Sequence, residues 1–195
     1  MGMKPRPTPR KTVPARAQYA DPDLFLPLTE GERADALRLV TEEKKLATMV
    51  KVGRYRVVSI EPLALKPPHE RAGYRCARVI IYDYAADANV AASVDLENSD
   101  VFHATTSKRQ PMLSEAEEAA AIGTAVASDQ VASLLALGDE VQGVMHYWSR
   151  QAVDFAFRRR TAAVLFGQSG GTPSLVAIVD MLDGEVTEVV PADRW

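Results

Sequence analysis

The spacing of apolar residues changes twice along the chain, and the same changes occur in both halves. Residues 28–53 carry apolar side chains such as Leu37 and Val40 near helical spacing, and a glycine follows at position 53. Residues 113–138 show the same spacing and also end in a glycine. This pattern is typical of an amphipathic helix that ends at a glycine. We therefore predict one helix at the start of each half.

Each predicted helix begins with the residues of a capping box. Thr29 and Ser114 stand where the helix starts, and Glu32 and Glu117 follow three positions later. In this motif the hydroxyl and the carboxylate satisfy backbone N–H groups that have no partner in the first turn. The motif predicts helix starts at these two places.

After each helix the apolar positions alternate with a period near two, and β-branched residues become frequent. Both features are typical of strands. In the first half the predicted strands are 54–64, 75–84, 89–96 and one after the turn at 97–100. In the second half they are 141–150, 159–167, 174–181 and one after the turn at 182–185.

A shift of 85 residues places the second half on the first without a gap. Arg75 then falls on Arg160, and Asp95 falls on Asp180. A register that holds from the helix into the strands indicates an internal duplication. We predict an α+β fold of two tandem units, 24–109 and 110–195, each a helix packed on a four-stranded antiparallel sheet.

The amino-acid sequence of the first unit resembles that of the two small N-terminal domains of copper amine oxidases, which are of the N2/N3, cystatin-like type. The motifs that carry the resemblance are "LTEGE" at 28–32, "VVSIEPLALKPP" at 57–68, "ARVIIYD" at 77–83 and "VDL" at 94–96. The resemblance is weaker in the second unit, which opens with "QPMLSEAE" at 110–117. It implies two cystatin-like units and a tendency to pack or pair with other subunits.

The catalytic motifs of that family are absent from this sequence. The resemblance would place them in a large C-terminal domain, as an Asn-Tyr pair that yields the quinone cofactor and as a His-x-His copper site. This sequence has neither. Its three histidines, His69, His103 and His146, are far apart, whereas metal ligands are usually closely spaced. We therefore expect no amine oxidase activity, no cofactor and no metal site.

His146 and Trp148 are the first candidates for a binding site. Strand alternation places both on one face together with Val144, and Tyr147 on the other face. An imidazole beside an indole suits a pocket for a flat organic ligand, with His146 as catalytic acid or base if the protein is an enzyme. The alternative is an aromatic core that contains one hydrogen-bonded histidine.

Tyr82 and Tyr84 are further ligand-binding candidates, because two tyrosines flank a carboxylate at a strand end. Ordinary edge tyrosines are the alternative. At the offset of 85 the second half has Gly167 and Ser169 in their place, so folding alone does not require the tyrosines. The arginines of "FRRR" at 157–160 suit an anion, and a solvated strand entry is the alternative.

Charge and composition limit the possible partners and the location. Residues 1–23 form a basic, proline-rich stretch that we predict to be a disordered arm. Residues 21–195 carry a net charge of −8, with 18 Lys and Arg against 26 Asp and Glu. This balance argues against nucleic acid as a partner. The sequence has no stretch long and apolar enough to span a bilayer, and a single cysteine, so we expect no membrane association and a cytoplasmic location.

Two functions remain open. The first is a non-catalytic binding or assembly protein, dimeric through sheet edges or helices. The second is a small cofactor-independent enzyme, a cyclase, isomerase or hydratase, that acts on a hydrophobic metabolite in a cavity between helix and sheet. His146 would be catalytic only in the second, and Tyr82, Tyr84 and Trp148 would contact the ligand.

Overall fold

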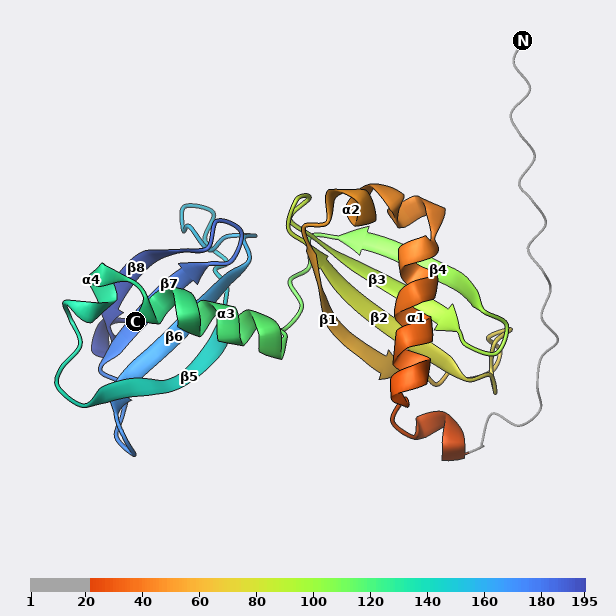
Figure 1. Cartoon of the computed structure of the whole chain (residues 1–195), viewed down its shortest axis with the longest axis horizontal. Coiled ribbons are helices and arrows are strands. Elements are labelled where there is room, and N and C mark those ends of the chain that lie inside the picture. The colour runs from red at the N-terminus through yellow and green to blue at the C-terminus, as the bar shows by residue number, and fades with distance from the viewer. Residues whose placement is uncertain (1–21) are drawn as a thin grey trace, which may run out of the picture.

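The protein consists of two α+β units that lie end to end (Figure 1). The structure is a computed structural model and describes residues 22–195. The predicted basic arm therefore lies outside the described residues up to position 21, and Pro22 and Asp23 belong to a short 3₁₀ helix. No helix of the described part is long and apolar enough to cross a membrane.

The first unit begins with helices and continues as a four-stranded sheet. Its elements are η1 (Pro22–Phe25), α1 (Glu30–Glu42), η2 (Lys44–Leu46), α2 (Ala47–Val52), β1 (Tyr55–Pro62), β2 (Cys76–Asp83), β3 (Ala88–Asp95) and β4 (Asp100–Ser107). The strands pair antiparallel in the order β1-β2-β3-β4.

The second unit has the same order of elements. They are α3 (Glu115–Val126), α4 (Asp129–Ala132), β5 (Asp139–Tyr147), β6 (Thr161–Gln168), β7 (Leu175–Asp180), β8 (Glu185–Pro191) and η3 (Ala192–Arg194). The sheet order is β5-β6-β7-β8. The predicted fold class is confirmed: each unit places its α-helices on one face of a four-stranded antiparallel sheet.

Both predicted capping boxes are present. Oγ1 of Thr29 accepts from the backbone N–H of Glu32 at 3.2 Å, and the Glu32 carboxylate accepts from the Thr29 N–H at 2.7 Å. Ser114 and Glu117 make the same pair of bonds at 3.3 and 2.8 Å. These bonds fix where α1 and α3 begin.

The helical segment of the first unit is interrupted, whereas one continuous helix was predicted. Helix α1 ends at Glu42 because Glu43 adopts an extended backbone, and the Glu43 carboxylate accepts from the N–H of Lys45 to start a new turn. The glycine predicted to end the segment does end α2, as Gly53 has a φ of 72°. The predicted single helix is therefore two helices joined by a turn.

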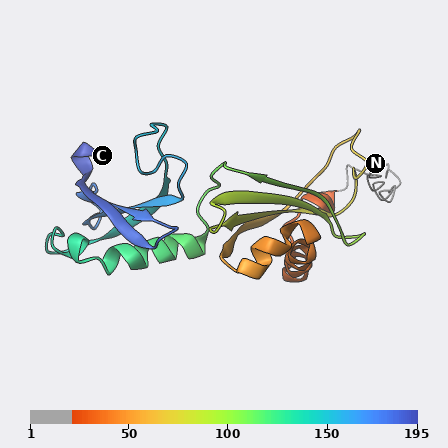
Figure 2. The same ribbon diagram turned by 90° about the horizontal axis from the view of Figure 1, so that it is seen from above.

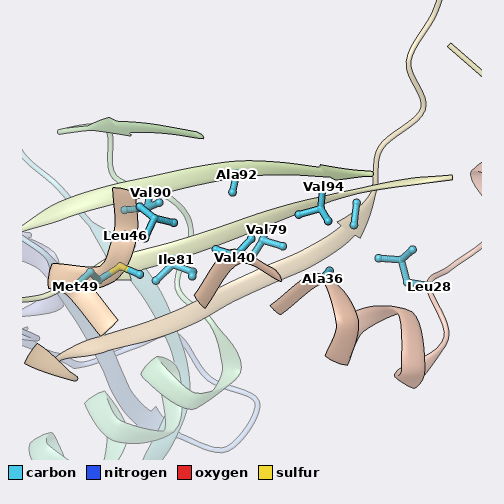
Figure 3. Packing of buried hydrophobic residues seen from close by; sticks show 11 residues of the cluster. Leu28, Ala36, Val40, Leu46, Met49, Val79, Ile81, Val90, Ala92 and Val94 are labelled. Carbon is cyan, nitrogen blue, oxygen red and sulfur yellow. The ribbon is translucent and has the colours of Figure 1, made fainter. Parts of the chain in front are cut away.

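The core of each unit lies between the helices and the sheet. In the first unit Ala36 and Val40 of α1 pack on a row of small and β-branched side chains from β2 and β3 (Figure 3). In the second unit Ala121 and Ala125 of α3 pack on Val164 and other residues of β6 and β7. Alanines on the helices let them approach the sheets closely.

Candidate functional site

Where the two units meet, the end of β2 in the first unit lies against the start of α3 in the second. The hydroxyl of Tyr84 donates a hydrogen bond to Oε1 of Glu117 at 2.5 Å. The ring of Tyr82 is fully buried, and the guanidinium of Arg160 lies over it at 4.7 Å. The Tyr82 hydroxyl donates to Asp87 and accepts from Gln110 at 2.9 Å. Both tyrosines therefore take part in joining the units.

Arg160 and Glu117 are the charged centre of this junction. Both side chains are completely buried. Nε and Nη2 of Arg160 donate to the two carboxylate oxygens at 2.9 and 2.8 Å. Burial alone would raise the pKa of Glu117, but the hydrogen bonds and charge of Arg160 outweigh it, and this pKa lies below its ordinary value. The Glu117 carboxylate is therefore ionised at neutral pH.

Arg160 also holds the segment that connects the units. Its guanidinium donates to the carbonyl of Pro111, and to that of Met112 at 2.8 Å. The interpretation of "FRRR" as a solvated strand entry is therefore wrong for Arg160. Arg159 pairs with Asp180 and Asp183, and Arg158 is exposed.

The first unit contains the same arrangement, 85 residues earlier. Nε of Arg75 pairs with Glu32 at 2.7 Å, and the guanidinium donates to the carbonyls of Leu26 and Pro27 at 3.0 and 3.1 Å. This pair is only partly buried. The sequence offset could have identified both pairs, since it aligns each arginine and each glutamate.

His146 lies in the wall of the junction, on the same face of β5 as Val144. Val144 packs on the α3 side of the sheet and Tyr147 on the opposite side, as the alternation predicted. Burial, and then the charge of Arg160, lower the pKa of His146 to about 4. The imidazole is therefore neutral at pH 7. Its Nε2 atom is enclosed and has no hydrogen-bond partner among the described residues.

A groove of about 640 Å³ opens beside His146. We call it the His146 groove. Its apolar lining consists of Met112 from the connecting segment and of Trp148 and Phe157 from the loop between β5 and β6. Trp148 was predicted within a strand, but β5 ends at Tyr147, so the indole stands at the start of this loop. The volume is in the range of small-molecule sites.

The four predicted site residues thus lie in one region but do not form one pocket. His146 and Trp148 line the same groove. Tyr84 lines another groove of about 410 Å³ between the units, near Arg54, which donates to the carbonyl of Leu182 at 3.0 Å. Tyr82 lines neither. Ligand binding by the tyrosines stays a prediction.

The other two histidines lie on the first unit. His69 and His103 line a groove of about 480 Å³ that also contains Arg78. Within residues 22–195 no group of three or more His, Cys, Asp or Glu side chains is arranged to hold a metal ion.

The fold of the chain is similar to that of a known protein, although its sequence matches none. No protein-family model matches the sequence, and no curated protein matches it. Among solved structures the chain is similar to a copper-containing benzylamine oxidase from Hansenula polymorpha, with a TM-score of 0.57 over 86% of this chain and 12% sequence identity. The chain spans 30% of that oxidase chain. The likeness shows the fold alone, and at that level it confirms the resemblance to the small N-terminal domains of copper amine oxidases.

Proposed function

We propose that this chain is a non-catalytic binding and assembly module, without amine oxidase activity of its own, that associates with a second copy of itself. One observation carries the proposal: large apolar side chains are left exposed on the second unit. We call this set the outer apolar surface. It consists of Met145, Val153, Phe155 and Trp195, with exposed fractions of 45%, 94%, 45% and 45%.

The segments that carry these side chains reach one side of the second unit. Met145 alternates with His146 on β5 and so shares the face of Tyr147, whose ring lies 5.7 Å from that of Trp195. The loop after β5 and the C-terminal end both project from the side of the sheet opposite α3 (Figure 2). Exposed apolar side chains gathered on one side of a protein can mark an interaction site. A second copy could cover this side.

The fold likeness supports an assembly role in a second way. The chain corresponds to under a third of the oxidase chain whose fold it shares. In the oxidase, the matching part is therefore joined to further chain that this protein does not match. A module of this kind is suited to packing against other protein surfaces.

Sedimentation velocity tests the proposal. We expect the wild-type protein to form a dimer and a double variant, Val153→Asp with Phe155→Asp, to be a monomer. Leu137→Asp is the matched control, because Leu137 is fully exposed and lies outside the outer apolar surface. A wild-type protein that stays monomeric at every concentration contradicts self-association. Turnover of benzylamine by the purified chain contradicts the lack of oxidase activity.

The second candidate function is a cofactor-independent enzyme acting on a hydrophobic metabolite. It is favoured by the neutral imidazole of His146 in the wall of a groove large enough for a substrate. A base with a low pKa is unprotonated at neutral pH and can accept a proton. Time-resolved NMR of candidate metabolites would test it with His146→Ala and with the exposed His103→Ala as control. Equal turnover by both variants would remove His146 from the mechanism.

A further inference from the structure

The His146 groove differs in charge from the rest of the protein. Four cationic side chains line it, Lys108, Arg109, Arg150 and Arg158, and among residues 22–195 no Asp or Glu does. The chain as a whole is acidic, so this local excess of positive charge is not a property of the average surface. The groove is therefore attractive to an anion.

Three of these cations are not neutralised within the described part of the chain. Arg109, Arg150 and Arg158 are exposed, and none has a carboxylate partner among residues 22–195. The neighbouring Arg159 and Arg160, in contrast, are both paired with acids. The amine of Lys108 donates to the carbonyls of Ala86 and Asp87, which fixes its position without cancelling its charge. Three guanidinium groups are thus free for a ligand.

Two of these arginines lie against aromatic rings. The guanidinium of Arg150 is 5.1 Å from the ring centroid of Trp148, and that of Arg158 is 5.1 Å from the ring centroid of Phe157. Cation–π contacts of this kind hold a guanidinium beside an apolar surface while its N–H groups stay available. The groove therefore offers flat apolar contacts and carboxylate-binding donors at the same place.

From this arrangement we propose that the His146 groove binds a small planar aromatic ligand that carries a carboxylate. The ring packs on Trp148, Phe157 and Met112, and the carboxylate accepts hydrogen bonds from Arg150 and Arg158. Guanidinium and carboxylate match each other in geometry because both are planar and can form two parallel hydrogen bonds. The proposal does not rest on either function proposed above, since a ligand held with or without turnover satisfies it.

Isothermal titration calorimetry on the full chain tests the proposal with three probes of one shape. These are 2-naphthoate, the neutral 2-naphthamide, and 2-naphthylmethylamine, which is cationic at neutral pH. We expect 2-naphthoate to bind at least about tenfold more tightly than the amide, and the amine not to bind. Equal affinities for the acid and the amide would overturn the charge requirement, and an absence of saturable naphthoate binding would overturn the site. Inorganic phosphate that competes as well as naphthoate would show that the ring is not recognised.

Variants locate the binding in the groove. Arg150→Gln combined with Arg158→Gln removes two charges from exposed positions, and we expect naphthoate binding to weaken by about tenfold or more. Trp148→Ala should weaken the acid and the amide alike. Arg33→Gln is the control, because Arg33 is exposed on the first unit. Unchanged circular dichroism and melting temperature show that each variant is folded, and unchanged naphthoate affinity in the double arginine variant contradicts the proposal.

Discussion

Arg160 and Glu117 form a completely buried, two-pronged ion pair at the start of α3. Removing two charges from water is costly, and a buried pair is tolerated only when further hydrogen bonds satisfy the remaining donors. The carbonyls of Pro111 and Met112 provide these bonds for Arg160, and the hydroxyl of Tyr84 donates to Glu117. The pair therefore links α3, β6, the connecting segment and the first unit.

Replacing Glu117 by Gln should destabilise the protein strongly. The amide keeps the size of the side chain but leaves the charge of Arg160 buried without a counter-charge. Breaking a buried pair in this way costs about 3–5 kcal/mol. Urea unfolding followed by circular dichroism measures the loss of unfolding free energy.

The control is Glu32→Gln, the equivalent substitution in the first unit. The Glu32 carboxylate is 27% exposed and that of Glu117 is 0% exposed, so solvent screens the first pair more. We expect a loss of about 1 kcal/mol. Equal losses for the two variants would show that burial of the second pair is not what makes it important.

Tyr84→Phe should weaken the contact between the units. The hydroxyl that is removed donates to a charged carboxylate, and such hydrogen bonds contribute about 1.5–3 kcal/mol. Because the partner is Glu117, the effect should be smaller in the Glu117→Gln background, where the acceptor is a neutral amide oxygen instead of a charged carboxylate. A double-mutant cycle measures this difference. Tyr55→Phe is the control, since the Tyr55 hydroxyl has no hydrogen bond within residues 22–195. Additive losses would contradict a direct coupling between Tyr84 and Glu117.

Stability should fall as the pH drops from about 6.5 to about 4, partly because of His146. In the folded protein burial lowers the pKa of His146 from 6.5 to about 4. Between these values the unfolded chain binds a proton that the folded protein does not, so acidification favours unfolding. In His146→Gln the fall in unfolding free energy between pH 7 and pH 4.5 should be smaller by about 1–2 kcal/mol than in the wild-type protein. This value allows for the partial exposure of the ring. Urea unfolding at pH 7 and pH 4.5 measures the difference, and identical pH slopes for both proteins would contradict it.

Much of the fold follows from local sequence signals. The capping boxes mark the starts of α1 and α3, and the change to alternating apolar residues marks the strands. The break after Glu42 does not follow from the apolar spacing, which continues to Val50. It depends on the carboxylate of Glu43, which bonds a backbone N–H two residues later. A continued α1 and a new turn capped by the Glu43 side chain differ little in free energy, so apolar spacing alone does not predict which one forms.

The site is predictable only in part, because its residues converge from distant segments. The sequence identified Tyr82 and Tyr84 as positions that folding of one unit does not require. It did not identify their partners, since Glu117 lies 33 residues after Tyr84. The cations of the His146 groove likewise come from the connecting segment and from the loop after β5. Nothing in local spacing indicates that these two segments meet.

The strand end of the second unit that corresponds to Tyr82 carries no side chain. Gly167 occupies the place of Tyr82 at the offset of 85. A Cβ there would lie 2.9 Å from Nε2 of Gln142 and 2.9 Å from the carbonyl oxygen of Thr172. The glutamine can move, but the backbone of Thr172 cannot move without distorting the hairpin turn. Gly167→Ala should therefore cost about 1–3 kcal/mol of unfolding free energy.

Gly143→Ala on the neighbouring strand is the matched control, because within residues 22–195 only Gly143 and its two chain neighbours have heavy atoms within 4 Å of a Cβ at that position. We expect this variant to be neutral or slightly more stable, since alanine loses less backbone entropy than glycine on folding. Thermal unfolding of the two variants gives the comparison. If Gly167→Ala were as stable as Gly143→Ala, the tight packing at Gly167 would not explain why a tyrosine is absent there. If Gly167→Ala is destabilised as expected, a different contact explains the residue at each strand end. Tyr82 is needed for contact with the other unit, whereas Gly167 is needed for close packing against the hairpin loop of its own unit.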